Sequence, residues 1–224
     1  ETFDPTAVLN WIWKPKNGTT LNTGAAFRSV NYSTSALNWY NAADPRPDYY
    51  RYLPSYFADN QEAFDLYTDL WRHDKHFRQI NWDNLYQANY LNNQFGRGGN
   101  PDNHSASYIL ENRHSNQLNF IFNSLLNHRL NDHMTLQAGV SFNYPRAHYY
   151  KTIRDLLGGE YWLDVDQYSE RDFPGDPDMM QNNLRNPNRR VGKDDTFGYD
   201  YYINALHGNF WLQNIITLPQ WDIN

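Results

Sequence analysis

The chain has 224 residues, enough for one large domain or two small ones, and its composition excludes several classes of protein. With a net charge of -6 it offers no basic surface for nucleic acid, and without cysteine it has no disulfide, zinc–thiolate site or cysteine nucleophile. No apolar run is long enough for a membrane helix, although membrane-spanning strands alternate and would not give such a run. Aromatic residues reach 17%, which is typical of sugar-binding surfaces and of surfaces that are apolar at one end and wet at the other.

Two strands are predicted at the start of the chain, at about residues 6–14 and 19–30. Apolar residues alternate with their neighbours in both segments, and the segment between them, Lys14–Gly18, has the composition of a short turn. The pattern predicts a β-hairpin. Trp11 and Trp13 lie near its turn, where a membrane barrel would carry a belt of interfacial aromatic residues.

A long segment without regular alternation follows, at about residues 31–104. Such a length is unusual for a connection and indicates either function or independent structure. Between Asn60 and Tyr90 the apolar residues, Phe64 and Leu70 among them, approach helical spacing, which predicts short helices. The glycine-rich segment Gly96–Pro101 is expected to interrupt the chain after them.

The clearest alternation in the chain predicts a second hairpin, with strands at about residues 105–127 and 133–144 and a turn at Asn127–Asp132. One face of this hairpin is apolar and the other carries amides and hydroxyls. That pattern fits a soluble sheet with one wet face, and equally a barrel wall with lipid outside and water inside. In the second strand, the apolar positions are Met134, Leu136, Ala138, Val140 and Phe142.

The remaining prediction is a second long loop, at about 145–196, then a strand at about 197–217 and a short turn at Leu218–Asp222. Short and very long connections therefore alternate along the chain. Membrane barrels of the bacterial outer membrane have this arrangement, with short periplasmic turns and long extracellular loops. A soluble β-sandwich has no reason to sort its connections in this way.

Three segments resemble TonB-dependent outer-membrane receptors of the Bacteroidetes type, which are similar in plan to the SusC/RagA transporters. The most specific is Ala36–Tyr56, which reads ALNWYNAADPRPDYYRYLPSY. Tyr108–Arg113 (YILENR) and Gly198–Asn204 (GYDYYIN) resemble strand segments of the same family. Together these matches are spread over most of the chain.

The resemblance implies a closed barrel of about 22 strands around a plug. Such a receptor imports a scarce nutrient with energy from a periplasm-spanning partner. We recognise no plug domain, no N-terminal motif that would contact the energy-transducing partner, no signal peptide and no terminal aromatic strand. The chain is therefore expected to be an excerpt of the barrel wall. The predicted fold is mainly β, with antiparallel up-and-down strands forming part of a transmembrane β-barrel and long extracellular loops carrying short helices.

The expected function is uptake of a bulky ligand, such as an oligosaccharide or peptide, at the outer membrane of a Gram-negative bacterium. The expected partners are outer-membrane lipid, the TonB system through other parts of the receptor, and a surface lipoprotein; nucleic acid is not among them. The alternative is a soluble secreted carbohydrate-binding or adhesion module, in which the alternating strands pack one sheet on another. A weaker third hypothesis is a glycan-degrading enzyme.

The predicted ligand-binding residues are aromatic side chains that could stack on a sugar or another ligand. The competing interpretation is that these rings fold the loop on itself, with local ion pairs among Asp44, Arg46 and Asp48, and this interpretation is favoured. Prolines at 45, 47 and 54 stiffen the same segment. The predicted ligand-binding residues are Trp39, Tyr40, Tyr49, Tyr50, Tyr52 and Tyr56.

Metal binding and catalysis have weaker sequence support. His73 and His76 have a spacing that can hold a metal on a helix, but no third ligand is evident, and a solvated helix face is the simpler interpretation. Asp164–Asp166 begins like a calcium loop without the glycine that such a loop needs. We therefore expect no metal, no cofactor and no enzyme activity. Carboxylates that could pair for catalysis, but are more typical of turns, are Asp172, Asp176, Asp178, Asp194 and Asp195.

Overall fold

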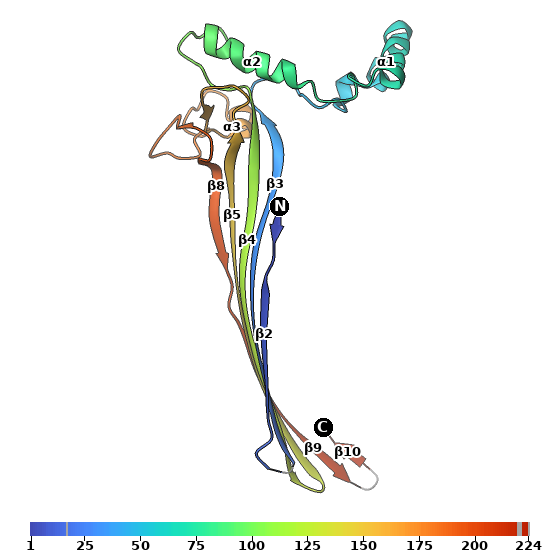
Figure 1. The fold of residues 1–224 in the computed structure, drawn as a ribbon, viewed down its shortest axis with the longest axis vertical. Helices are drawn as coiled ribbons and strands as arrows, with labels where there is room; N and C mark the ends of the chain where they lie inside the picture. Colours follow the sequence, from blue (N-terminus) through green and yellow to red (C-terminus); the bar gives the residue numbers. More distant parts are fainter. Residues whose placement is uncertain (17, 219–220, 224) are drawn as a thin grey trace. The chain divides into compact units, whose positions relative to one another are not determined.

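The computed structural model describes residues 1–16, 18–218 and 221–223, and within them the fold is mainly β with a few short helices (Figure 1). An antiparallel sheet of long strands dominates, as the alternation predicted. In the described residues its strand path is open, running β1-β3-β4-β5-β9-β10, with β2 beside β3 and β8 beside β5. These strands are β1 (Thr2–Phe3), β2 (Thr6–Trp13), β3 (Thr19–Trp39), β4 (Tyr108–Asn131), β5 (Met134–Asp155), β8 (Thr196–Asn204), β9 (His207–Leu218) and β10 (Trp221–Ile223).

The chain divides into two compact units. The first is made of Glu1–Thr34, Arg113–Tyr150 and Asp200–Asn224, and the second of Ser35–Asn112 and Lys151–Tyr199. The first unit is therefore built from strands and their short turns. The second contains the remaining ends of β3, β4, β5 and β8, together with the long connections and the helices.

One face of the first unit is apolar, and the registers connect it across the strands. Trp11 on β2 lies opposite Thr23 on β3, whose hydroxyl bonds that of Ser124 on β4 at 2.8 Å. Further along β4, the Phe120 ring packs edge-on against Phe142 of β5 at 6.2 Å. Beside Phe142 on the same face, Val140 lies opposite Phe210 of β9. We call this the apolar face; it includes Leu9, Trp11, Trp13, Leu21, Phe120, Leu136, Val140, Phe142, Phe210 and Leu212.

The opposite face of the first unit carries amides and hydroxyls. Gln137 lies opposite Gln213, and Ser141 lies opposite Asn209. On this face Trp211 lies across Gly139, where an added Cβ would come within 2.3 Å of the indole nitrogen. Glycine at 139 therefore makes room for the indole. We call this the polar face.

The turn between β4 and β5 is shorter than predicted. The sequence placed it at Asn127–Asp132, but β4 continues to Asn131 and β5 begins at Met134. Two local bonds explain the tight turn: the Asn131 side chain accepts from the His133 amide at 2.9 Å, and Arg129 pairs with Asp132 at 2.7 Å. Polar residues that suit a loop by composition are here paired in a ladder.

The other predicted strand ends need correction as well. Strand β3 continues to Trp39 instead of ending near residue 30, and β5 continues to Asp155 instead of ending near 144, so both predicted loops are shorter. The alternation fades in these extensions, but the backbone of a polar strand still pairs with its neighbour.

The single strand predicted at 197–217 is in fact two, β8 and β9, separated at Ala205–Leu206. Ala205 donates its N–H to the carbonyl of Pro145 at 3.0 Å, and a proline has no N–H to return the bond, so the ladder is interrupted there. The turn predicted at Leu218–Asp222 includes Pro219 and Gln220, which lie outside the described residues.

Short helices occur in the second unit, as predicted between Asn60 and Tyr90. Each of the two longer ones begins at an asparagine that caps a backbone N–H: Asn60 accepts from Ala63 and Asn81 from Asn84, both at 3.1 Å. The second ends at Gly96, which has a φ of 76°. The remaining elements of this unit are η1 (Tyr50–Tyr52), η2 (Pro54–Phe57), α1 (Gln61–His73), α2 (Trp82–Phe95), β6 (Trp162–Leu163), α3 (Gln167–Asp172) and β7 (Arg190–Val191), with β6 paired to β7.

The buried core also lies in the second unit. Ile109, Ile153, Trp162 and Phe197 pack together, and a second cluster surrounds Leu85, Tyr108 and Leu157. Asn89 of α2 is fully buried between strand and loop: its side chain accepts from the amides of Ser107 and Tyr108, and donates to the carbonyls of Tyr108, Leu156 and Leu157. In the part of the chain that is described, no helix is long and apolar enough to cross a membrane.

Candidate functional site

A cavity of 280 Å³ in the second unit combines aromatic walls with polar side chains. Trp162 and Phe197 are buried in its wall, whereas the Tyr168 and Tyr199 side chains are exposed. Side-chain amides from Asn38, Gln167 and Asn182 also face it. Such a mixture of rings and amides suits a ligand with apolar faces and hydroxyl edges, such as a sugar. We call this the aromatic cavity; its aromatic lining residues are Tyr40, Trp162, Tyr168, Phe197 and Tyr199.

A lysine–glutamate pair lies at the base of the aromatic cavity. The Lys151 ammonium lies 3.5 Å from the fully buried carboxylate of Glu111, and 4.6 Å from the centre of the Phe197 ring. Asn38 donates a further hydrogen bond to Glu111 at 2.8 Å. Gly198, with a φ of 70°, leaves space for the lysine, because an added Cβ would lie 2.9 Å from Lys151 Cε. The cavity thus holds a fixed cation whose charge is balanced by its own carboxylate.

Tyr40 is the one predicted ligand-binding residue that lines this cavity. Its hydroxyl donates to Glu170 at 2.8 Å, and its ring packs edge-on against Trp162 at 6.4 Å. Arg97 lies over the ring at 5.2 Å and donates to the Tyr40 carbonyl. Burial, helped by the hydrogen bond to Glu170, raises the pKa of Tyr40 to about 12, so the hydroxyl stays protonated and acts as a donor.

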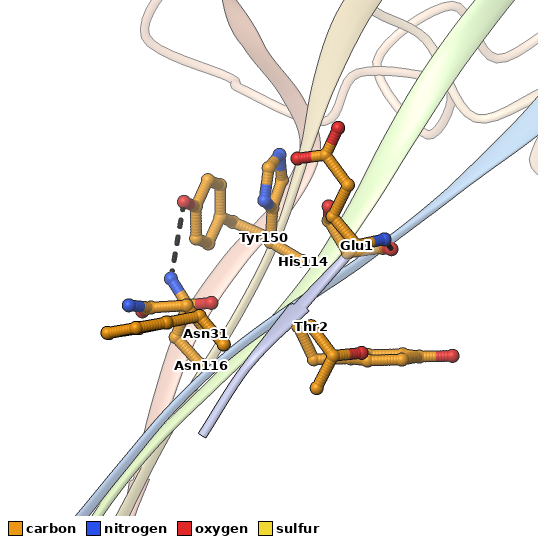
Figure 2. A pocket seen from close by; sticks show the side chains of 9 residues that line it. Glu1, Thr2, Asn31, His114, Asn116 and Tyr150 are labelled. Atoms are coloured by element: carbon orange, nitrogen blue, oxygen red, sulfur yellow. Dashed lines mark hydrogen bonds between the residues drawn. The ribbon is translucent and has the colours of Figure 1, made fainter. Parts of the chain in front are cut away.

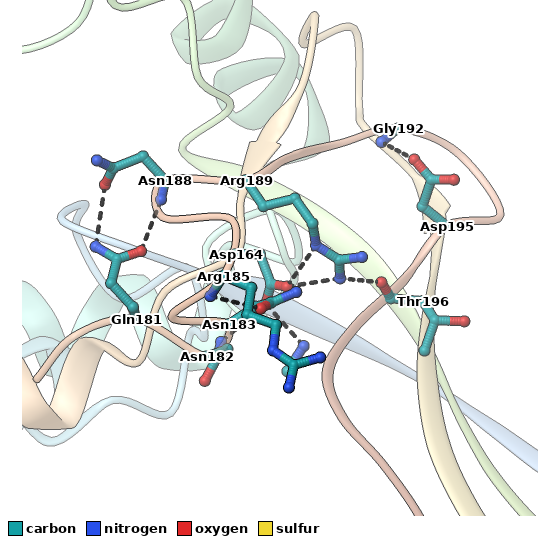
Figure 3. Close-up of polar contacts among 11 residues, drawn as sticks. Asp164, Gln181, Asn182, Asn183, Arg185, Asn188, Arg189, Gly192, Asp195 and Thr196 are labelled. Atoms are coloured by element: carbon teal, nitrogen blue, oxygen red, sulfur yellow. Dashed lines mark hydrogen bonds and ion pairs between the residues drawn. The ribbon is translucent and has the colours of Figure 1, made fainter. Parts of the chain in front are cut away.

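A network of polar contacts centred on Asp164 holds the loop that contributes Asn182 to the aromatic cavity (Figure 3). One carboxylate oxygen of Asp164 accepts from Asn182 and from the Gly198 amide, each at 2.8 Å, and the other pairs with Arg189 at 2.6 Å. Asp166 caps α3 by accepting from the Tyr168 amide. Both carboxylates are therefore engaged in structure, and the calcium loop suggested for Asp164–Asp166 is not formed.

The remaining predicted ligand-binding residues lie away from the aromatic cavity. The rings of Tyr49, Tyr50, Tyr52 and Tyr56 pack edge-to-face on one another, with centres 4.7 to 5.6 Å apart. The chain of rings continues through Phe57 and Tyr67. Their arrangement matches the competing interpretation, in which the rings fold the segment on itself.

Trp39 lies in neither the aromatic cavity nor the tyrosine segment. It packs beside the cluster around Leu85, and the Arg46 guanidinium lies 5.2 Å from the centre of its ring. Arg46 also pairs with Asp44 at 2.5 Å, as the local ion-pair interpretation required. Burial works to raise the pKa of Asp44, but the hydrogen bonds from Arg46 outweigh it and the pKa is lowered. A second cavity of 330 Å³ lies between this segment and α2, and Asp44, Arg46 and Tyr52 line it.

A cavity of 420 Å³ in the first unit is mainly polar (Figure 2). His114 and Tyr150 lie side by side at 4.3 Å, and Asn116 lies 3.4 Å from the Tyr150 hydroxyl. Glu1 and Thr2 also line it, so one of its walls is the first strand segment of the sequence.

The histidines and aspartates considered for metal binding or catalysis lie in local contacts of the fold. Helix α1 ends at His73, so His76 does not share a helical face with it, and the His73 ring instead bonds Asp69 at 2.8 Å. Among the described residues, no group of three or more His, Asp or Glu side chains could hold a metal. Asp172 pairs with Arg171, and Asp176 and Asp195 each accept a nearby backbone amide, from Asp178 and Gly192 respectively; Asp194 has a φ of 68° in a turn.

Sequence reasoning missed most of the aromatic cavity. Lys151 and Glu111 are forty positions apart, on two strands, and neither stands out in its own segment. Trp162 lies in a stretch that was predicted as loop. The one local signal was Gly198, a glycine within an otherwise aromatic strand segment, which can mark a close approach by another side chain.

The arrangement has the features of a binding site for a small polar ligand. The aromatic cavity offers ring faces, amides and a balanced lysine–glutamate pair, and each carboxylate near it already has a hydrogen-bonded partner in the fold. A scan against protein-family models and searches of curated proteins and of solved structures found no match to this chain.

Proposed function

We propose that this chain is part of the barrel wall of a TonB-dependent outer-membrane receptor that imports a bulky ligand, such as an oligosaccharide or peptide. The observation that carries the proposal is the two-faced sheet of the first unit. Its apolar face is exposed to an unusual degree: Leu9 is 70% exposed and Phe210 is 71% exposed. Its polar face carries the amides that would line a hydrated channel.

The length of the apolar face agrees with a lipid bilayer. On β5 the unbroken apolar row extends over the nine residues from Met134 to Phe142. A tilted strand needs roughly 9–11 residues to cross the hydrocarbon layer. Trp11 and Trp13 stack at 6.2 Å at the end of the face nearest the hairpin turn, as expected for an aromatic belt at an interface.

A soluble module would have to cover this apolar face with a second layer. Contiguous exposed apolar surface of this kind marks a membrane or protein contact. In the described residues, the only other sheet is the two-stranded β6–β7 pair, which belongs to the second unit. We therefore propose outer-membrane lipid as the first partner. The energy-transducing system would act through other parts of the receptor, and a surface lipoprotein would be a further partner.

The aromatic cavity supports the ligand side of the proposal. Its two exposed rings, Tyr168 and Tyr199, could stack on a sugar ring while Asn38, Gln167 and Asn182 bond its hydroxyls. The tyrosine rings of the segment 49–56 pack edge-to-face on each other, so we assign them a structural role.

The solution behaviour of the chain tests the barrel proposal. We expect the purified chain to aggregate in water and to become monodisperse only in detergent, because its apolar face and unpaired strand edges need cover. Analytical ultracentrifugation with and without detergent measures this. A detergent-free monomer with one cooperative thermal transition would favour the soluble carbohydrate-binding or adhesion module instead.

Substitutions at the cavity mouth test the ligand site. A panel of neutral sugars, acidic sugars and peptides first identifies an oligosaccharide that the complete receptor binds. Tyr168→Ala and Tyr199→Ala should then each weaken binding of that oligosaccharide by about threefold to tenfold. Calorimetry gives the affinity. Tyr50→Ala, another exposed tyrosine of the same unit, is the matched control and should leave it unchanged. A loss confined to Tyr50→Ala would move the site to the tyrosine segment.

A further inference from the structure

Four aromatic rings form a continuous stack across three strands of the first unit. His114 of β4 lies on Tyr150 of β5 at 4.3 Å, Tyr150 lies on His148 at 4.4 Å, and His148 lies on Tyr202 of β8 at 3.9 Å. Each pair is within 24° of parallel. Asp200 fixes the stack from the side, because its carboxylate bonds the His148 ring at 2.6 Å. The stack therefore links the three strands through their side chains.

The end of this stack carries Arg146. Its guanidinium lies 4.6 Å from the centre of the Tyr202 ring. In the described part of the chain, Arg146 has no ion-pair partner. The carboxylate of Asp200, on the same strand as Tyr202, pairs with His148 instead. An arginine without an ion-pair partner can offer its N–H groups in the fork geometry that binds phosphate through two hydrogen bonds.

A cavity of 280 Å³ lies beside the guanidinium. Its polar lining includes Asn31 and Asn116, and Leu118 and Tyr202 add apolar surface. His148 also lines it, with Arg146. The cavity therefore offers one unpaired cation, two amides and an apolar flank. This combination suits an anionic group that is attached to an apolar chain.

The position of Arg146 in the sheet identifies the occupant. Arg146 follows Phe142, the last residue of the apolar row on β5, by four positions, so both side chains lie on the same face of the strand. On the neighbouring segment, β8 ends at Asn204, and Leu206 just beyond it is exposed. Arg146 thus lies where the apolar face gives way to polar side chains, which is the level of lipid headgroups if the apolar face meets the bilayer.

We propose that Arg146, held by the ring stack, binds the phosphate of a glycolipid headgroup in the outer leaflet. This inference rests on the proposed function, because it needs the apolar face to lie in the membrane. The same guanidinium could in principle take free phosphate, but the adjoining apolar face favours a phosphate that carries acyl chains.

The test uses the complete receptor in detergent, with native mass spectrometry to count bound lipid. The probes are an acylated glucosamine disaccharide with two phosphates, the same glycolipid without phosphates, and inorganic phosphate. For the phosphorylated glycolipid, Arg146→Gln should weaken binding by about tenfold or more, because it removes a charge-assisted bond. Tyr202→Leu, which removes the support of the guanidinium, should weaken binding in the same direction. Arg154→Gln, an exposed arginine on the same strand, is the matched control.

The outcomes separate this inference from the proposed function. Loss of glycolipid with Arg146→Gln but not with Arg154→Gln supports it, provided that both variants keep the wild-type thermal transition. Equal retention by Arg146→Gln, or equal binding of the dephosphorylated glycolipid, overturns it while leaving the barrel intact. Inorganic phosphate that binds as tightly as the glycolipid also overturns it. A receptor that needs no detergent contradicts the barrel proposal, and the headgroup site falls with it.

Discussion

Replacing Asn89 with alanine is expected to destabilise the second unit by about 3–5 kcal/mol, because several buried backbone groups would lose their only side-chain partner at once. The Asn89 amide donates to the carbonyls of Tyr108 and Leu157 at 2.8 and 3.1 Å. Its oxygen accepts from the Ser107 amide at 2.8 Å. These bonds tie α2 to β4 and to the end of β5, so their loss should open the whole loop unit.

Hydrogen exchange at the amides of Ser107 and Tyr108 measures the Asn89 effect directly. Asn84→Ala is the matched control, since Asn84 is an exposed asparagine on the same helix. It should change the free energy of opening by no more than about 0.5 kcal/mol. Equal protection in the two variants would mean that the bonds of Asn89 contribute little to holding the unit together.

The second large effect is expected from Lys151→Met, which removes the ammonium group 3.5 Å from the fully buried Glu111. Removing one partner of a buried ion pair typically costs about 3–5 kcal/mol of stability. Part of that loss should be recovered when Glu111→Gln is added, because a neutral amide needs no cation. The free energy of unfolding of the second unit, followed by denaturant titration, reports both variants.

A double-mutant cycle decides whether the lysine and glutamate act as a pair. We expect a coupling of at least about 1 kcal/mol between Lys151→Met and Glu111→Gln. Lys193→Met, at an exposed lysine of the same unit, should be nearly neutral. Strict additivity would show that the two groups are independent, and the aromatic cavity would then lack a fixed charge pair.

The strands of the first unit were predictable because apolar and polar side chains alternate along them. In β5 the alternation of Val140 with Ser141 is read directly from the sequence, because each face carries one kind of side chain. The same rule failed in the second unit. There the end of β3 at Trp39 and the end of β5 at Asp155 are covered by loops, so side chains on both faces find specific partners and the period of two disappears.

The aromatic cavity could be predicted only in part. Tyr40 was found because aromatic residues are conspicuous in its segment, but the rings that follow it pack on each other. The Lys151–Glu111 pair depends on the register of two strands, and one residue of slip would move either side chain to the opposite face. No local pattern carries that information. The Asp164 network likewise depends on partners such as Arg189, twenty-five positions away.

The most direct test of the barrel proposal compares two adjacent positions on β5. Single cysteines are introduced at Val140 and at Ser141 of the proposed receptor. The chain itself contributes no native cysteine that would take the label. Each is labelled with an environment-sensitive fluorophore in liposomes. Val140 lies opposite Phe210 on the apolar face, and Ser141 lies opposite Asn209 on the polar face.

We predict that the label at Val140→Cys is quenched by a brominated lipid and protected from aqueous iodide, and that the label at Ser141→Cys shows the reverse. Neighbouring residues of a strand point to opposite sides, so a membrane wall must separate them in this way. Equal quenching of both labels by iodide, with none by the brominated lipid, would contradict the proposal and place the apolar face against protein instead of lipid.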